Sequence, residues 1–136
     1  MPAIERVVVD TNVFVSRLLR YASIPGRAAD KAMHNSLLLV SAATMAELSE
    51  VLAQEKSDCY VTVEQRTQFI RLIAKIAEFV PIIHPVRECR DPKDDKFLEV
   101  SLNGRADVII TGDRDLLALH PWRDVAILSP AEYLKR

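Results

Sequence analysis

Short apolar runs alternate along the chain with longer segments in which apolar and polar residues recur at helical spacing. The runs are rich in Val, Ile and Leu, and unbroken runs of this kind are typical of strands that are covered on both faces of a sheet. They predict strands at residues 7–9, 36–41, 107–111 and 124–129. A further run at residues 79–86 contains two prolines, and it predicts an edge strand because proline cannot donate to a strand ladder.

The segments between these runs predict helices, several with recognisable start signals. Thr62 and Gln65 form a capping-box pattern, and Asp91 is an N-cap candidate followed by Pro92 at the first helical position. The predicted helices cover residues 12–21, 23–35, 42–55, 62–79, 91–104, 113–120 and 130–136. Strands that alternate with helices predict an α/β domain with a mainly parallel sheet and helices on both faces. We expect a single domain over residues 1–136.

The composition of the chain mainly excludes certain classes of protein. The formal net charge is −1, so any binding to nucleic acid requires a local basic patch rather than a global attraction. Cys59 and Cys89 are too few for a disulfide framework. No segment approaches the roughly 18 apolar residues of a membrane span, and the N-terminus does not read as a signal peptide. We therefore expect a soluble, cytoplasmic protein.

Two of the predicted strands end in acids. Asp10 follows the three valines, and Asp113 lies two residues beyond Thr111. The carboxyl ends of parallel strands share one edge of the sheet, and ligands bind there at the point where the strand order reverses. If these two strands flank that point, Asp10 and Asp113 face one crevice. Either acid alone could simply be the N-cap of the next helix.

Further acids come from the predicted helices. Glu47 lies at the margin of an apolar helical stripe, where the residues alone favour a solvated side chain. Asp95 precedes Leu98 by three positions and Leu102 by seven, so it shares the inward stripe of its helix. Asp94 remains an alternative inward acid, because apolar residues also follow it at three and four positions.

Several carboxylates in one crevice repel one another, by about 4 kcal/mol for two unit charges 4 Å apart at an effective dielectric constant near 20. Such a group must take up protons or bind a cation. Oxygen ligands without His or Cys suit Mg²⁺ or Mn²⁺, which can activate water and neutralise a departing oxyanion. The pattern therefore indicates phosphodiester or phosphoester hydrolysis. No phosphate-cradling glycine loop, dinucleotide fingerprint or nucleophile–histidine pair competes with it.

Four stretches carry a resemblance to a known family: VVVDTNVFVSRLL, AELSEVL, CRDPKDDKFLEVSLNGRADVIITGDRDLL and ILSPAEYL. The chain resembles, nearly end to end, the PIN-domain nucleases, and in particular the small prokaryotic toxins of toxin–antitoxin systems. The resemblance implies a three-layer α/β/α sandwich and an acidic site that binds Mg²⁺ or Mn²⁺ and cleaves RNA, usually single-stranded. It also implies products with a 5′-phosphate and a 3′-hydroxyl.

The resemblance also implies roles for individual residues. The catalytic, metal-binding acids are Asp10, Glu47, Asp95 and Asp113, with Asp115 as a further metal ligand. Asp95 is chosen over Asp94 because the family's acid stands three residues before an aliphatic position, here Leu98. Thr11, Asn12 and Thr111 could orient carboxylates or water, although turn and cap roles explain them equally well.

Basic residues near the expected crevice could contact RNA phosphates, although each could also be an ordinary solvated charge. They are Arg17, Arg20, Arg90, Lys93, Lys96 and Arg114. The resemblance further implies a cognate antitoxin that docks near the site, and a homodimer. The leading interpretation is thus a divalent-metal-dependent endoribonuclease that is the toxin of such a pair.

Two other functions are compatible with the fold. An acid-site phosphatase for small phosphoesters would commonly carry a second aspartate two residues after the first, where this chain has Asn12. A non-catalytic RNA-binding or assembly module would be expected to have lost one of the four acids, and all four are intact.

Overall fold

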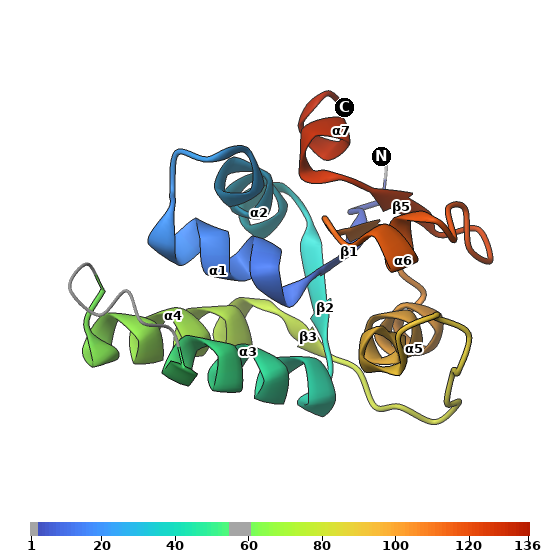
Figure 1. Ribbon diagram of the computed structural model, residues 1–136, viewed down its shortest axis with the longest axis horizontal. Helices are drawn as coiled ribbons and strands as arrows, with labels where there is room; N and C mark the ends of the chain where they lie inside the picture. The colour runs from blue at the N-terminus through green and yellow to red at the C-terminus, as the bar shows by residue number, and fades with distance from the viewer. Residues whose placement is uncertain (1–2, 55–60) are drawn as a thin grey trace.

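A five-stranded sheet forms the centre of the protein in a computed structural model, which describes residues 3–54 and 61–136 (Figure 1). The strands are β1 (Arg6–Val9), β2 (Leu37–Val40), β3 (Glu78–Phe79), β4 (Val108–Ile110) and β5 (Ala126–Leu128). Their order is β3-β2-β1-β4-β5, and every neighbouring pair is parallel. This confirms the predicted parallel α/β architecture.

The helices occupy the predicted segments, with ends that differ by a few residues. They are α1 (Thr11–Leu19), α2 (Ile24–Asn35), α3 (Ala42–Gln54), α4 (Val63–Ile76), α5 (Asp95–Gly104), α6 (Arg114–Leu117) and α7 (Pro130–Leu134). Thr62 caps α4 through the predicted capping box with Gln65. None of the helices in the described ranges has the length and apolar character that crossing a bilayer requires. Glu55, the last residue of the helix predicted over residues 42–55, and Cys59 lie outside these ranges. Cys89 is a free, buried thiol.

The valines of β1 divide between two cores, one on each face of the sheet. Val7 and Val9 pack with residues of α1, α2, α3, α4 and α7, whereas Val8 packs with residues of α5 and α6. This division follows from the alternation of side chains along a strand. Figure 1 shows α5 across the strands from α1 and α2. The layers therefore form the α/β/α sandwich that the family resemblance implied.

The predicted edge strand at residues 79–86 is largely wrong. Only Phe79 of that segment belongs to β3, which pairs with β2 at the edge of the sheet. Beyond it, the backbone N–H groups of Ile83 and His84 donate to the side chain of Asn103 on α5. A side-chain amide thus satisfies backbone groups that a sheet partner would otherwise bind.

Gly26 lies where the end of α1 and the following turn pass close to α2. A Cβ atom at this position would stand 2.5 Å from the carbonyl oxygen of Arg20 and 2.9 Å from that of Tyr21. Both are backbone atoms, so relief would require the two helices to separate. We expect Gly26→Ala to lower the free energy of unfolding by about 3 kcal/mol, measured by urea denaturation.

Gly112→Ala is the matched control for this substitution. A Cβ atom there meets nothing within 4 Å, and the backbone of Gly112 does not have a positive φ. The stability of this variant should stay within about 0.5 kcal/mol of the wild type. Equal stability of the two variants would contradict the proposed close approach of α1 and α2.

Candidate acidic site at the strand ends

The strand order reverses between β1 and β4, and this point positions the site. From β1 the chain proceeds outward to β2 and β3, then returns to the other side of β1 as β4. The backbone N–H of Asp10 donates to the carbonyl of Ile110 over 2.9 Å, so the ends of the two strands lie side by side. The strands that precede Asp10 and Asp113 therefore flank the switch point, which was the condition for the two acids to lie near each other.

Asp10 occupies the N-cap position of α1, yet its side chain makes no capping hydrogen bond. Its Oδ2 atom instead accepts a hydrogen bond of 2.6 Å from Oγ1 of Thr111, and the residue is only 6% exposed. Burial raises the pKa of Asp10, the hydrogen bond from Thr111 opposes this, and the charges of Glu47 and Asp113 raise it further. Capping therefore does not account for this aspartate.

Asp113 does cap a helix, and it also contributes to the acidic cluster. Its Oδ1 atom accepts hydrogen bonds from the backbone N–H groups of Asp115, at 2.8 Å, and Leu116, at 3.4 Å. Its own N–H donates to Oγ1 of Thr111 over 3.0 Å. Thr111, which is fully buried, thus links the two strand-end aspartates through one hydroxyl group.

Asp94, Asp113 and Asp115 each offer a carboxylate oxygen, and these atoms all lie within 4.8 Å of one another. Asp94 is therefore the acid from this segment that joins the strand-end cluster. Within the described ranges its Oδ2 atom is buried and has no hydrogen-bond partner. An unsatisfied buried oxygen beside two other carboxylates is the kind of feature that a bound cation would explain.

Among the residues that the structure describes, Asp95 is not brought into this group of carboxylates. Its Oδ1 atom accepts hydrogen bonds from the backbone N–H groups of Cys89, at 2.8 Å, and Glu88, at 3.2 Å, so the carboxylate fixes the preceding loop. The helical periodicity used in the prediction does not extend to Asp94, because residues Pro92–Asp94 form a 3₁₀ turn and α5 begins only at Asp95.

The pKa of Asp94 is raised to about 7. Burial is the largest cause, followed by the negative charges of Asp113 and Asp10. Burial and the neighbouring carboxylates thus both favour the protonated form of Asp94.

Glu47 is held in place by residues from two other helices. Its Oε2 atom accepts a hydrogen bond of 2.5 Å from Oγ1 of Thr11, and its Oε1 atom lies 2.7 Å from Nζ of Lys96. The carboxylate is close enough to Asp10 to raise the pKa of that residue. The interpretation of Glu47 as a merely solvated helix residue is therefore wrong.

A family model described as a PIN domain matches residues 6–115. The chain belongs to the PIN domain family. The matched range contains all the clustered carboxylates, from Asp10 to Asp115. The chain is also 32% identical over 118 residues to the uncharacterized protein MJ1680 of Methanocaldococcus jannaschii, a match that covers 84% of this chain and 74% of that protein.

Solved structures of low sequence identity share the PIN fold. VapBC2 from Rickettsia felis, in a crystal structure bound to a DNA fragment from its promoter, has a TM-score of 0.60 at 10% identity, over 91% of this chain and 98% of that chain. The PIN domain endonuclease Utp24 has a TM-score of 0.55 at 19% identity, over 91% of this chain and 84% of that chain. The family and the fold together support a nuclease.

The orienting residues expected in this PIN domain have different environments. Thr11 and Thr111 make hydrogen bonds to Glu47 and Asp10, as described above. Asn12 is exposed, and no hydrogen bond of its side chain is found in the described ranges. Its expected orienting role therefore stays a prediction.

The basic residues expected to contact RNA fall into two groups. Arg17 donates to Asp30 over 2.9 Å and Lys96 to Glu47 over 2.7 Å, so both are engaged within the protein. The others have exposed side chains: Arg20, Arg90, Lys93 and Arg114. Lys93 and Arg114 directly precede and follow clustered aspartates in the sequence, so their backbones adjoin the site.

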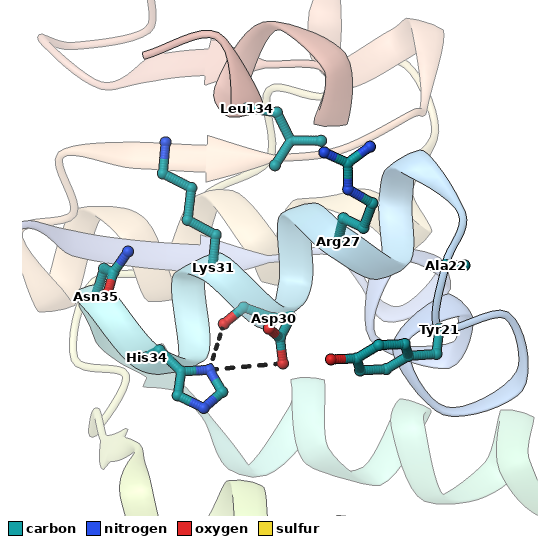
Figure 2. A pocket seen from close by; sticks show the side chains of 8 residues that line it. All are labelled: Tyr21, Ala22, Arg27, Asp30, Lys31, His34, Asn35 and Leu134. Carbon is teal, nitrogen blue, oxygen red and sulfur yellow. Dashed lines mark hydrogen bonds and ion pairs between the residues drawn. The ribbon is translucent and has the colours of Figure 1, made fainter.

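A cavity of about 530 Å³ on the PIN domain involves none of the clustered carboxylates (Figure 2). Its charged side chains are largely paired within the protein. Figure 2 shows the imidazole of His34 beside both the carboxylate and the carbonyl of Asp30. Lys31 donates to the carbonyl oxygens of Tyr133 and Arg136. Asp30 is the one acid among the described residues that line this cavity, which therefore lacks the crowded carboxylates that mark the acidic cluster.

The raised pKa of Asp94 predicts a pH-dependent stability in the absence of divalent cations. Between the ordinary value of 3.8 and about 7, the folded protein keeps a proton that the unfolded chain has released. The stabilisation that Asp94 contributes to the folded protein is therefore fully present below pH 3.8. It is lost as the pH rises toward about 7. With a chelator present, Asp94→Asn should match the wild type near pH 4 and exceed it at pH 8 by on the order of 1 kcal/mol, allowing for partial solvent screening.

Urea denaturation of the two proteins across this pH range measures the difference. Parallel stability curves for the wild type and Asp94→Asn would show that Asp94 ionises freely in the folded protein, and would contradict the crowded cluster.

Proposed function

We propose that this PIN domain is a divalent-metal-dependent endoribonuclease that hydrolyses phosphodiester bonds of single-stranded RNA. The observation that carries the proposal is the convergence of Asp94, Asp113 and Asp115 to within 4.8 Å, beside the buried Asp10. Mg²⁺ or Mn²⁺ is the proposed cofactor. In this proposal Asp94 takes the role that the family resemblance gave to Asp95, and Asp10, Glu47, Asp113 and Asp115 keep theirs.

The donor set fits such a cation. All three clustered residues are aspartates, and hard carboxylate oxygens suit Mg²⁺ or Mn²⁺ better than softer metals. The buried Oδ2 atom of Asp94, which has no hydrogen-bond partner in residues 3–54 and 61–136, is available as a ligand. A cation would also remove the repulsion that raises the pKa of Asp94.

When bound, a divalent cation would lower the pKa of a water molecule and stabilise the negative charge that develops on the phosphodiester. The residues of the chain would hold and orient it. Thr111 fixes one oxygen of Asp10, Thr11 fixes one oxygen of Glu47, and the backbone of α6 fixes one oxygen of Asp113. Each carboxylate is thus anchored through one oxygen before any substrate arrives, which is the preorganisation that electrostatic catalysis requires.

Neighbouring aspartates on the chain provide the sharpest test of this site. With a labelled single-stranded RNA and Mn²⁺, Asp10→Asn and Asp94→Asn should each lower the cleavage rate by at least about 100-fold, because each removes a ligand carboxylate. Asp95→Asn is the matched control. Its amide oxygen can still accept the loop N–H groups, so its rate should stay within about tenfold of the wild type.

Chemical analysis of the product ends tests the mechanism in the same reaction. The family resemblance implies products with a 5′-phosphate and a 3′-hydroxyl, and a 2′,3′-cyclic phosphate would contradict a water nucleophile. Equal RNA cleavage rates for the wild type and Asp10→Asn would contradict the proposed catalytic site. A wild type that binds Mn²⁺ but cleaves no RNA would favour an RNA-binding module, and release of phosphate from small phosphoesters would favour a phosphatase.

We also propose that the protein is the toxin of a toxin–antitoxin pair and forms a homodimer. The support is the family resemblance together with the fold shared with VapBC2. Expression in a bacterial host should arrest growth in a manner that depends on Asp10, and co-expression of a small gene adjacent to this one should relieve the arrest. Unimpaired growth with an active nuclease would contradict the toxin role, and a monomeric mass in sedimentation would contradict the dimer.

A further inference from the structure

A lysine lies among the carboxylates of the site. The Nζ atom of Lys96, on the first turn of α5, is 2.7 Å from the Oε1 atom of Glu47 on α3. Both side chains are mostly buried, with relative exposures of 21% and 25%. Ion pairs at this depth are screened less by solvent than pairs on the surface.

Both oxygens of Glu47 are occupied in this arrangement. Oε2 accepts from Thr11 over 2.5 Å, and Oε1 accepts from Lys96. Thr11 is a neutral donor and can remain in place beside a metal ligand. Lys96 carries a positive charge, and an ammonium group and a divalent cation on the same carboxylate would repel each other strongly.

We propose that Lys96 is a built-in counter-ion that occupies Glu47 in the metal-free protein and is displaced when a divalent cation binds. Lys96 then sets how tightly the site holds its metal, because part of the binding energy is spent in breaking its contact with Glu47. It acts through Glu47 and is therefore a positioning residue. The inference rests on the proposed function in one respect, namely that Glu47 is a metal ligand.

Titration of the full chain with Mn²⁺ by calorimetry tests this competition without any RNA. Replacement of Lys96 by methionine should lower the Kd for Mn²⁺ by at least about threefold, since a competing ion pair of this kind is removed. Lys96→Arg keeps the charge and should leave the Kd within about twofold of the wild type. Lys96→Gln, which is uncharged but can still donate to Glu47, serves as a second variant if the methionine variant folds poorly.

The variant Lys93→Met distinguishes loss of the Lys96–Glu47 contact from a general loss of positive charge near the site. Lys93 lies on the 3₁₀ turn just before α5 and has an exposed side chain, so this variant removes the same charge near the site. Its Kd for Mn²⁺ should change by less than about twofold, because exposed charges are well screened. An equal effect of Lys93→Met and Lys96→Met would overturn the specific competition.

A double-mutant cycle with Glu47→Gln identifies the partner. If Lys96 acts through Glu47, then in a Glu47→Gln background the Lys96→Met substitution should alter the Kd by less than about twofold. A full effect in that background, or weaker Mn²⁺ binding by Lys96→Met alone, would overturn the proposal.

RNA cleavage by the wild type is scored separately from these titrations. A wild type that cleaves RNA but whose Mn²⁺ affinity is insensitive to Lys96→Met would overturn the role of Lys96 and leave the nuclease function standing. A wild type that shows no Mn²⁺ binding would overturn both.

Discussion

Repulsion among carboxylates held at the end of a rigid sheet is the constraint on which this structure depends. Asp10 and Asp113 follow adjacent strands, and Asp94 is brought to them by the turn that opens α5. None of these positions can relax without disturbing a strand or a helix start. Asp94 shows the effect, because burial and the charges of Asp113 and Asp10 raise its pKa to about 7 and its buried Oδ2 atom has no partner in the described part of the chain. The stability of the metal-free fold and the chemistry of the site are thus opposed.

Neutral and positive donors limit this repulsion in the metal-free protein. The hydroxyl of Thr111 joins Asp10 to the backbone of Asp113, and Thr11 and Lys96 together bind both oxygens of Glu47. These contacts link three helices to each other and two strand ends to each other at this edge of the sheet. The same contacts fix the directions of the carboxylates, so the features that make the cluster tolerable also prepare it for a cation.

Much of this arrangement follows from local patterns in the sequence. The run Val7–Val9 predicts a strand covered on both faces, and the structure divides its side chains between two cores. The acid after each of two strands predicts a shared crevice, because parallel strands have their carboxyl ends at one edge. These inferences depend only on residue type and periodicity, and both of those are visible in a single sequence.

The features that the sequence did not predict depend on three-dimensional geometry, which the spacing of apolar residues does not reveal. Asp94 ends a 3₁₀ turn that lies before the periodic part of the helix, so neither the periodicity nor the family alignment through Leu98 revealed that it joins the cluster. The contact of Lys96 with Glu47 joins residues 49 positions apart, and it depends on side-chain conformations that only the packed helices determine. The strand expected at residues 79–86 failed because Asn103, also distant in sequence, binds the backbone there.

The most direct test of the central claim is the position of Mn²⁺ in crystals of the full chain, located by anomalous diffraction. The account predicts an ion at the carboxyl ends of β1 and β4, with carboxylate oxygens of Asp94 and Asp113 within about 2.5 Å of it. An ion coordinated by Asp95 in place of Asp94, or no ion at the strand ends at saturating Mn²⁺, would contradict it.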